Sequence, residues 1–567
     1  MFFMHNNDKI TLYAYVVEFV FGGEALGKKM LRVICVVLAL TVILSMTSCS
    51  KNDGAGALLK YGFTTDPKNL DPQLALDTPS LNVIQNMFEG LMKVSADGTI
   101  TNGVAESYQV SADGLKYTFY LKENAYWIGK NDYNEQVTAD DFVFAFQRLL
   151  NPVTKSPFAT EYYCIKNAQS VNESTEFASM LGVKALSDFV LEFELEYPNA
   201  DFLSLLTKSS SMPCNREFFY STKGKYGLET SAVISNGAFY LHQWLYDPYG
   251  KNNYLILRKN QLYSENSQVY PAGLNYFVIR NEDQLISDFL NDKIDFIVDD
   301  KMTKTLHAKE KTTSVGYEIS SSGIIFNMNK SAFQTQDARK AFAICIDRSL
   351  FKDELPKSAK VAYGLIPSGV TMLNKSFREL SAEPCLNDYN RVLAQYLWES
   401  SFTQAEKTEL ESASVIVPES YPNSDYVKLA VNQWGEVLGF YCAVEVLPDS
   451  EYNKRILSGD FYFAIQQIRG TENSAQSYLS CFSGEGSLAV AGYFDEELDA
   501  ILDDARARKT LTESLKDYQK AEKLVCDSSY YIPLFYEQEY LIYSEKIKDV
   551  IYNPFTGQID FSIAKKF

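Results

Sequence analysis

An apolar run close to the N-terminus restricts where this 567-residue chain can fold. Two lysines precede the run, which extends from Leu31 to Met46, and small residues follow it up to Cys49. Basic residues, a short apolar stretch and small residues are the three regions of a secretory signal. A membrane-spanning helix needs about 20 apolar residues, and this shorter run also contains Arg32 and Ser45. We predict that the remainder folds outside the cytoplasm; an uncleaved anchor helix, the alternative, leads to the same compartment.

The residues just before Cys49 resemble the bacterial lipobox, with Met46 where that motif usually has leucine. The resemblance implies that Cys49 receives a diacylglyceryl group and becomes the new N-terminus. The polar residues from Ser50 to Gly56 would then be a tether to the membrane surface. The expected segments are a mis-assigned N-terminal extension (1–27), a lipoprotein signal peptide (28–48) and a lipid-anchored tether (49–57).

The charge of the chain argues against one class of partner. The net charge of −19 becomes −20 without the first 49 residues, because those contain four basic and three acidic residues. A strongly acidic protein repels phosphate backbones, and no basic stripe with interleaved aromatic residues occurs. We therefore expect no nucleic-acid partner.

The cysteines and histidines indicate neither a disulfide framework nor a metal site. Seven of the nine cysteines follow Cys49, an odd number without CxxC spacing, which favours isolated thiols. The two histidines after it, His242 and His307, lack metal-ligand spacing, and no nucleophile-elbow, P-loop or dinucleotide motif occurs. We predict no cofactor, no metal and no enzymatic activity. A surface enzyme stays open as an alternative, because glycosidase carboxylates need no local motif.

Strand and helix patterns alternate along the chain, which is typical of an α/β fold. Apolar and polar residues alternate over 115–122 and 189–197, so we expect half-buried strands there. Residues 138–152 have a helical pattern, with Thr138 as cap and Pro152 as stop. Later patterns predict helices over 425–439, 494–508 and 514–527, and an aromatic strand over 530–536.

Seven ordered segments resemble the peptide-binding branch of the extracytoplasmic solute-binding proteins that serve ABC importers. They include "NMFEGLM", "VTADDFVFAFQRLLNP" and "SNGAFYLHQW". The complete set is 66–73, 86–92, 104–127, 137–152, 235–244, 324–349 and 521–536. The resemblance covers the chain from Asp66 to about Tyr543.

The resemblance implies a two-lobed α/β fold like the type II periplasmic binding proteins, with mixed sheets flanked by helices and a hinge between the lobes. Lobe I would consist of 58–88, 210–280 and 542–567, with an inserted subdomain over 89–209, and lobe II would be 281–541. A ligand would be enclosed between the lobes, with its main chain paired to strand edges.

The ligand-anchoring segment departs from the family pattern. The family has an aspartate there that pairs with the free amine of the peptide. In "IQQIRGTENSAQSYL" (465–479), Thr471 takes the position of the aspartate, unless the loop aligns one or two residues differently. Glu472 would replace that charge after a small local shift, whereas Arg469 would favour an acidic ligand.

The resemblance implies a receptor that captures a peptide or peptide-like solute and delivers it to an ABC permease. It would be a monomer, lipid-anchored through Cys49 outside the cell membrane or in the periplasm. Alternatives are the same fold binding an oligosaccharide or metal chelate, a sensor for signalling peptides and, more distantly, a secreted hydrolase. The expected ligand-binding residues are Asp77, Thr78, Asn236, Gly237, Asn327, Arg469, Thr471 and Glu472.

Overall fold

The computed structural model describes residues 56–567, except 97, 131–132, 251, 302, 352–353, 382–388 and 485. Residues Ala55–Lys566 form one compact unit. The expected extension and signal peptide, most of the tether and Cys49 lie outside the described residues. Among the residues described, no helix has the length and apolar character needed to cross a membrane.

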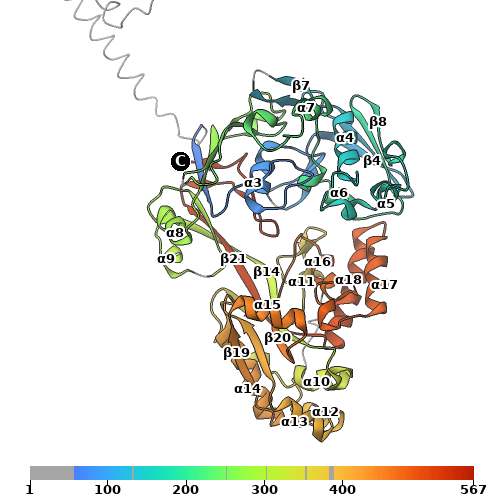
Figure 1. The fold of residues 1–567 in the computed structure, drawn as a ribbon, viewed down its shortest axis with the longest axis vertical. Coiled ribbons are helices and arrows are strands. Elements are labelled where there is room, and N and C mark those ends of the chain that lie inside the picture. The colour runs from blue at the N-terminus through green and yellow to red at the C-terminus, as the bar shows by residue number, and fades with distance from the viewer. Residues whose placement is uncertain are drawn as a thin grey trace, which may run out of the picture. The chain divides into compact units, whose positions relative to one another are not determined.

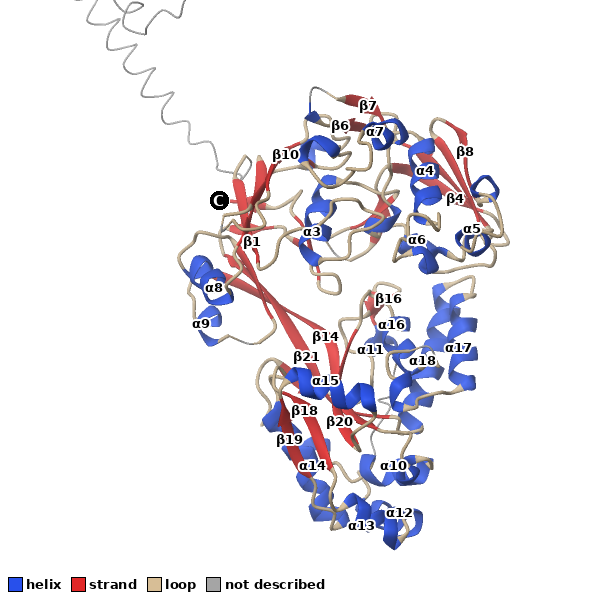
Figure 2. Ribbon diagram, viewed as in Figure 1, coloured by secondary structure: helices blue, strands red, loops and turns tan. Residues whose placement is uncertain are grey.

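One mixed sheet of eleven strands runs through the compact unit (Figures 1 and 2). Ten of them follow the order β10-β11-β12-β1-β13-β21-β14-β20-β18-β19, and β15 pairs with β21 beside this path. In chain order the strands are β1 Leu58–Phe63, β10 Phe239–Leu245, β11 Tyr254–Lys259, β12 Gly273–Val278, β13 Phe296–Asp299, β14 Thr312–Phe326, β15 Ala359–Val361, β18 Ser414–Pro418, β19 Ala443–Leu447, β20 Phe463–Arg469 and β21 Tyr531–Ser544.

The two long strands β14 and β21 connect two groups of hydrophobic core. The first group draws on residues 59–296 and 541–564, and the second on 319–535 together with Phe555. We call the parts of the chain around these cores lobe I and lobe II. The β14–β21 ladder shifts register between Glu318 and Ser320, and again between Ser322 and Gly323. Such bulges bend a strand and increase its twist, so the connection is irregular where it enters lobe II.

Lobe I carries a separate four-stranded sheet of order β4-β5-β9-β8, where β4 is Ala105–Val110, β5 Lys116–Leu121, β8 Val183–Ser187 and β9 Val190–Glu194. The predicted strands over 115–122 and 189–197 are confirmed as β5 and β9, whose alternate residues are buried. Helix α4, Ala139–Leu149, packs on this sheet, and its Phe146 ring lies 5.1 Å from that of Phe193. The predicted cap is confirmed, because the Thr138 N–H donates to the Asp141 carboxylate at 2.9 Å.

Helices cover both faces of the lobe II strands. Ile324 and Ile325, neighbours on β14, point into different core clusters, as the period of a strand requires. One cluster contains α10, α12 and α14 (Gln336–Ala343, Arg391–Ser401 and Ser424–Leu438), and the other contains α15, α17 and α18 (Asp449–Ser458, Glu496–Arg506 and Leu511–Asp527). The helices predicted over 425–439, 494–508 and 514–527 are confirmed as α14, α17 and α18. Helix α14 ends at Gly439, whose φ of 71° suits glycine.

Candidate ligand-binding site

Strand β20 is paired along its full length on one side only. Its residues Phe463–Arg469 pair with β14, whereas β18 pairs with only Phe463 and Ala464. From Ile465 to Arg469 the other side of β20 has no strand neighbour among the described residues. We call this segment the β20 edge. A free strand edge presents main-chain groups to which another extended chain can pair.

The hydrogen bonds of β20 show which main-chain groups face the open side. The Ile465 carbonyl accepts from the Tyr452 hydroxyl at 2.7 Å, and the Gln466 carbonyl accepts from Tyr531, on the β14 side, at 3.3 Å. The main-chain N–H and C=O groups of successive strand residues point to opposite sides. Those of Gln467 and Arg469 therefore point away from β14, as the carbonyl of Ile465 does. No strand of the described chain pairs with Gln467 and Arg469 on that side, and no described residue outside the strands accepts a backbone hydrogen bond from their N–H groups. These two N–H groups are therefore candidate donors to a ligand.

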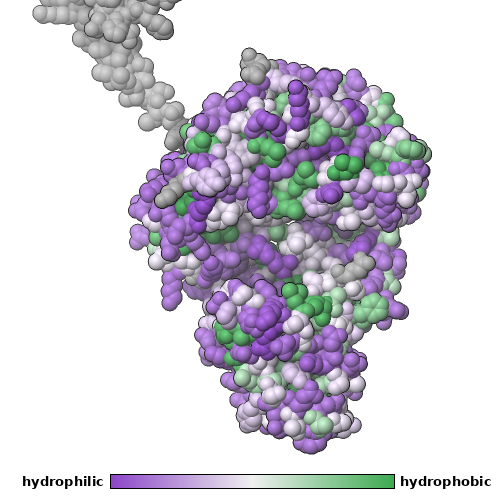
Figure 3. Space-filling model, viewed as in Figure 1, coloured by the Kyte–Doolittle hydropathy of each residue, from purple (hydrophilic) through white to green (hydrophobic). Residues whose placement is uncertain are grey.

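A pocket of about 150 Å³ lies directly beside the β20 edge. We call it the Tyr421 pocket; it is lined by Pro418, Ser420, Tyr421, Pro422, Tyr452, Ile465, Gln466 and Gln467. The face drawn in Figure 3 is hollowed at the level where β14 and β21 pass between the lobes, and hydrophilic residues surround the hollow. The pocket joins apolar walls to side-chain amides and hydroxyls, which is the usual make-up of a ligand site.

The carboxylate of Glu537 lies behind the Tyr421 pocket. It is buried (6% exposed) and accepts hydrogen bonds from the Asn423 amide (2.7 Å), the Ser322 hydroxyl (2.7 Å) and the exposed Gln467 amide. Asn423 follows Pro422 of the pocket and precedes helix α14. Gln467 therefore separates this carboxylate from solvent.

Arg469, at the end of the β20 edge, is joined to lobe I. Its guanidinium donates to Glu539 of β21 at 2.8 Å and to the Pro554 carbonyl at 2.7 Å. Glu539 is buried and also accepts from the Tyr552 hydroxyl. Burial lowers the pKa of Arg469, but the charge and the hydrogen bond of Glu539, together with smaller contributions from Tyr552 and Asp300, outweigh it and the net direction is upward. The positive charge that we expected to favour acidic ligands is thus neutralised within the protein.

A second ion pair joins the two lobes at the loop after β20. The Lys208 ammonium of lobe I lies 2.5 Å from the Glu472 carboxylate of lobe II and 2.8 Å from that of Glu161. Burial and then the charge of Glu472 raise the pKa of nearby Asp201 to about 6, while Lys208 opposes this shift. Close by, the Ala200 N–H donates to the Arg508 carbonyl at 3.0 Å. One lysine therefore serves two carboxylates here, and Asp201 forms no ion pair in the described chain.

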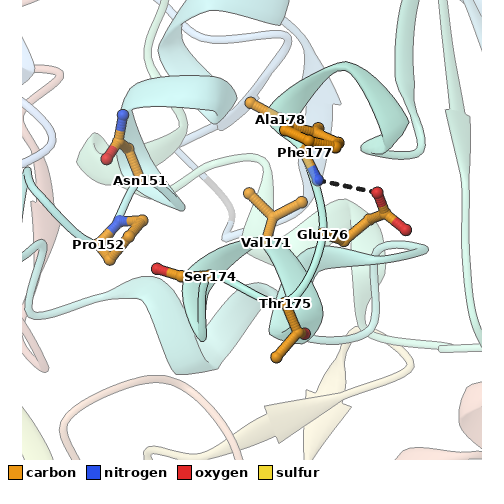
Figure 4. A pocket seen from close by; sticks show the side chains of 8 residues that line it. All are labelled: Asn151, Pro152, Val171, Ser174, Thr175, Glu176, Phe177 and Ala178. Carbon is orange, nitrogen blue, oxygen red and sulfur yellow. Dashed lines mark hydrogen bonds between the residues drawn. The ribbon is translucent and has the colours of Figure 1, made fainter.

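A larger pocket of about 320 Å³ lies elsewhere, on the inserted region of lobe I (Figure 4). It is lined by Asn151, Pro152, Val171, Ser174, Thr175, Glu176, Phe177 and Ala178. The Glu176 carboxylate accepts from the neighbouring Phe177 N–H at 2.9 Å, and Phe177 itself is 79% exposed. None of these residues belongs to β14, β20 or β21, so we place the candidate site at the Tyr421 pocket and the β20 edge.

Comparison with known proteins identifies the fold and the family. The family model described as "Bacterial extracellular solute-binding proteins, family 5 Middle" matches residues 99–488. The chain belongs to this family of extracellular solute-binding proteins. The dipeptide-binding protein DppE of Bacillus subtilis is 23% identical over 561 residues, which cover 93% of this chain and 98% of that protein. The probable deoxycholate-binding protein YgiS of Escherichia coli is 23% identical over 492 residues, covering 85% and 88%.

A solved structure confirms the fold expected for a family 5 protein. The unliganded open form of the murein tripeptide binding protein MppA superimposes with a TM-score of 0.70 at 21% identity. The superposition covers 90% of this chain and 97% of that one. The two-lobed α/β fold predicted from the sequence is thus confirmed, as is the recognition of the family.

Three residues that we expected to contact the ligand contact the protein's own backbone in the structure. The Asn236 side chain donates to the Glu89 carbonyl (2.8 Å) and accepts from the Glu89 N–H (3.1 Å). A Cβ at Gly237 would lie 2.9 Å from the Met87 backbone. The Asn327 amide donates to the carbonyls of Gly459 (2.9 Å) and Phe461 (3.0 Å). Ligand roles for these three residues stay predictions; their observed contacts stabilise loops of the family 5 fold.

The other predicted residues lie in three places. The Asp77 carboxylate caps helix α3 (Thr78–Met87) by accepting from the Ser80 N–H at 2.9 Å and its hydroxyl at 2.8 Å, and Thr78 is the exposed first residue of that helix. Arg469 ends the β20 edge, and Thr471 is exposed in the loop that follows. Glu472 pairs with Lys208. The structure brings Arg469, Thr471 and Glu472 into one segment, and their contact with a ligand stays a prediction.

Four residues at or near the site were not predicted from the sequence: Tyr421, Asn423, Glu537 and Lys208. A signal for one of them was present, because Glu537 and Glu539 alternate in an otherwise aromatic and apolar stretch. Charges at period two indicate that one face of the strand is polar. Lys208 had no local signal, because its partner Glu472 is distant in the sequence.

Proposed function

We propose that this family 5 protein is a lipid-anchored receptor that captures a peptide or peptide-like solute between its lobes and delivers it to an ABC import permease. The observation that carries the proposal is the β20 edge beside the Tyr421 pocket. An extended peptide offers the same N–H and C=O groups whatever its sequence, so pairing with the main-chain groups of Gln467 and Arg469 would give affinity without side-chain choice. Side chains would enter the adjacent pocket. DppE, a relative that spans nearly the whole chain, is named for dipeptide binding.

The remaining parts of the proposal follow from the sequence. We place the diacylglyceryl anchor on Cys49 and the body outside the cell membrane, as a monomer without enzymatic activity. The lobe bounds of 58–88, 210–280 and 542–567, with 89–209 inserted, and 281–541 stay predictions; the core groups that define the lobes above include Phe296 and Leu541 in lobe I. Replacing Cys49 by serine (Cys49→Ser) should move the protein from the membrane fraction to the soluble extracytoplasmic fraction. Retention in the membrane fraction would contradict the anchor.

A second candidate is a family 5 receptor for a ligand without a free amine, such as an oligosaccharide, a metal chelate or a blocked signalling peptide. Two observations favour it. Thr471 stands where the family pattern has the amine-binding aspartate, and a hydroxyl cannot neutralise an ammonium. The neighbouring Glu472 is occupied by Lys208 at 2.5 Å. The relative YgiS, named as probably deoxycholate-binding, is also a protein of this kind.

Native and denaturing mass spectrometry of the protein from Ser50 to Phe567 distinguishes the two candidates. Gentle purification retains a ligand that is enclosed between closed lobes. A heterogeneous set of peptide masses released on denaturation is the expected result and supports the peptide receptor. One defined non-peptide mass would replace it with the second candidate.

A further inference from the structure

The buried glutamates of the described chain differ in whether they pair with a basic side chain. Five are buried, and four of them pair with a basic side chain: Glu89 with Lys93, Glu318 with Lys360, Glu522 with Arg378 and Glu539 with Arg469. Glu537 has no lysine, arginine or histidine within ion-pair distance among the described residues, although it is only 6% exposed. A buried charge without a counter-charge is costly in a folded protein. Glu537 therefore lacks a counter-charge that the described chain does not supply.

The three hydrogen-bond partners of Glu537 are neutral groups. One oxygen accepts from the Asn423 amide at 2.7 Å, and the other accepts from the Gln467 amide and the Ser322 hydroxyl. Both oxygens therefore act as acceptors in this site. Three neutral donors hold this charge in place without neutralising it.

The carboxylate adjoins the Tyr421 pocket through two residues that line it, Gln467 and Tyr421. Gln467, which donates to Glu537, is exposed and lines the pocket. Tyr421 also lines it and is 6% exposed. Its hydroxyl lies close to Glu537 and Ser322 without forming a hydrogen bond of good geometry to either. Burial raises the pKa of Tyr421 well above its usual value, and the charge of Glu537 adds to the shift. A buried carboxylate without a counter-charge, next to a poorly bonded hydroxyl, points to a missing positive group in this pocket.

We propose that Glu537 is the anionic end of a subsite in the Tyr421 pocket that takes a positively charged group of the ligand. An ammonium or guanidinium there would displace the Gln467 amide, pair with Glu537 and approach the Tyr421 hydroxyl. This inference rests on the proposed peptide receptor and names the charge of its ligand. The cation has two sources, the terminal amine of the peptide or the side chain of a lysine or arginine. The subsite would supply from β21 the negative charge that Thr471 cannot supply.

Calorimetric titration with four tetrapeptides tests the inference on the protein from Ser50 to Phe567, which contains the entire compact unit. The peptides are tetra-alanine and a version with lysine at the second position, each with a free and with an acetylated N-terminus. We expect the peptides that place a cation in the subsite to bind at least about tenfold more tightly than acetylated tetra-alanine. An advantage of the free amine identifies the terminus as the source, and an advantage of lysine identifies the side chain.

The variant Glu537→Gln assigns the effect to one residue. It should lose the tenfold advantage of the cationic peptides over acetylated tetra-alanine. Asp425→Asn is the matched control, because it removes a carboxylate that is 86% exposed on helix α14, which Asn423 caps. Asp425→Asn should still bind the cationic peptides more tightly than acetylated tetra-alanine.

Three results would overturn the inference. Equal binding of all four peptides by the wild type would remove the cation preference while leaving the peptide receptor intact, and this result does not depend on how the variant folds. A preference that survives in Glu537→Gln would place the cation elsewhere. Binding of none of the four peptides would overturn the inference together with the proposed function.

Discussion

Glu537 and Glu539 lie two residues apart on β21, are equally buried and have opposite surroundings. Glu539 pairs with Arg469 and bonds to Tyr552 of lobe I. Glu537 meets only neutral donors, beside the Tyr421 pocket. Removing the partner of a buried, paired carboxylate destabilises the folded protein, whereas a carboxylate that has no partner at a pocket is available to a ligand. Burial alone therefore does not distinguish a structural charge from a functional one; the absence of an internal partner does.

The largest effect should follow from leaving Glu539 without its partner. Arg469→Met leaves a buried carboxylate that bonds only to the Tyr552 hydroxyl, so we expect the free energy of unfolding to fall by about 3 kcal/mol. Glu537→Gln places an amide N–H where an oxygen accepted hydrogen bonds, but it also removes a buried charge that has no counter-charge, so we expect a fall of only about 1 kcal/mol. Urea denaturation of both variants measures the difference. Equal losses would remove the distinction between the two glutamates.

A smaller effect is expected from the partly exposed ion pair between the lobes. Lys208→Met leaves Glu472 and Glu161 without a cation, but both are in contact with solvent, so we expect a loss of about 1 kcal/mol. The loss should shrink at high salt, because exposed charges are screened. Lys225→Met, in an exposed pair with Glu229, is the matched control and should cost less. If Lys208→Met lowered the free energy of unfolding as much as Arg469→Met does, solvent exposure would not explain a difference between the two ion pairs.

The smallest effect concerns Asp201 and depends on pH. Its pKa is raised to about 6 by burial and by Glu472, so the folded protein disfavours its charged form. Near pH 4 the carboxyl is largely protonated in the folded state, and the unfolded chain loses its proton first as the pH rises. Wild-type stability should therefore fall relative to Asp201→Asn between about pH 4 and 6, by on the order of 1 kcal/mol, and then stay level. Urea denaturation at pH 4, 5, 6 and 7 checks this, and a constant difference would contradict the raised pKa.

Local patterns in the sequence predicted many of the elements and the family. The alternation over 115–122 and the Thr138 cap depend on residues close in the chain, and both agree with β5 and α4. The length of β14 and β21 was not predictable in the same way. The predicted aromatic strand ended at Tyr536, whereas β21 continues to Ser544 because β14 and β13 supply partners from distant parts of the chain.

The site was harder to predict than the fold, for a physical reason. An amide that binds a peptide and an amide that binds the protein's own backbone are the same residue in the sequence. Asn236 and Asn327 are of the second kind in their observed contacts. Glu537 differs from Glu539 only in what the folded chain brings to it, Asn423 and Gln467 in one case and Arg469 in the other.

Hydrogen exchange at the β20 edge tests whether an extended peptide pairs with this strand. The measurement compares amide exchange with and without a saturating tetrapeptide that binds in the calorimetric series. If an extended peptide pairs with this edge, the amides of Gln467 and Arg469 should exchange more slowly in the complex, while those lining the pocket at 151–178 should not change. A peptide that binds but leaves the amides of 465–469 unprotected would contradict the account.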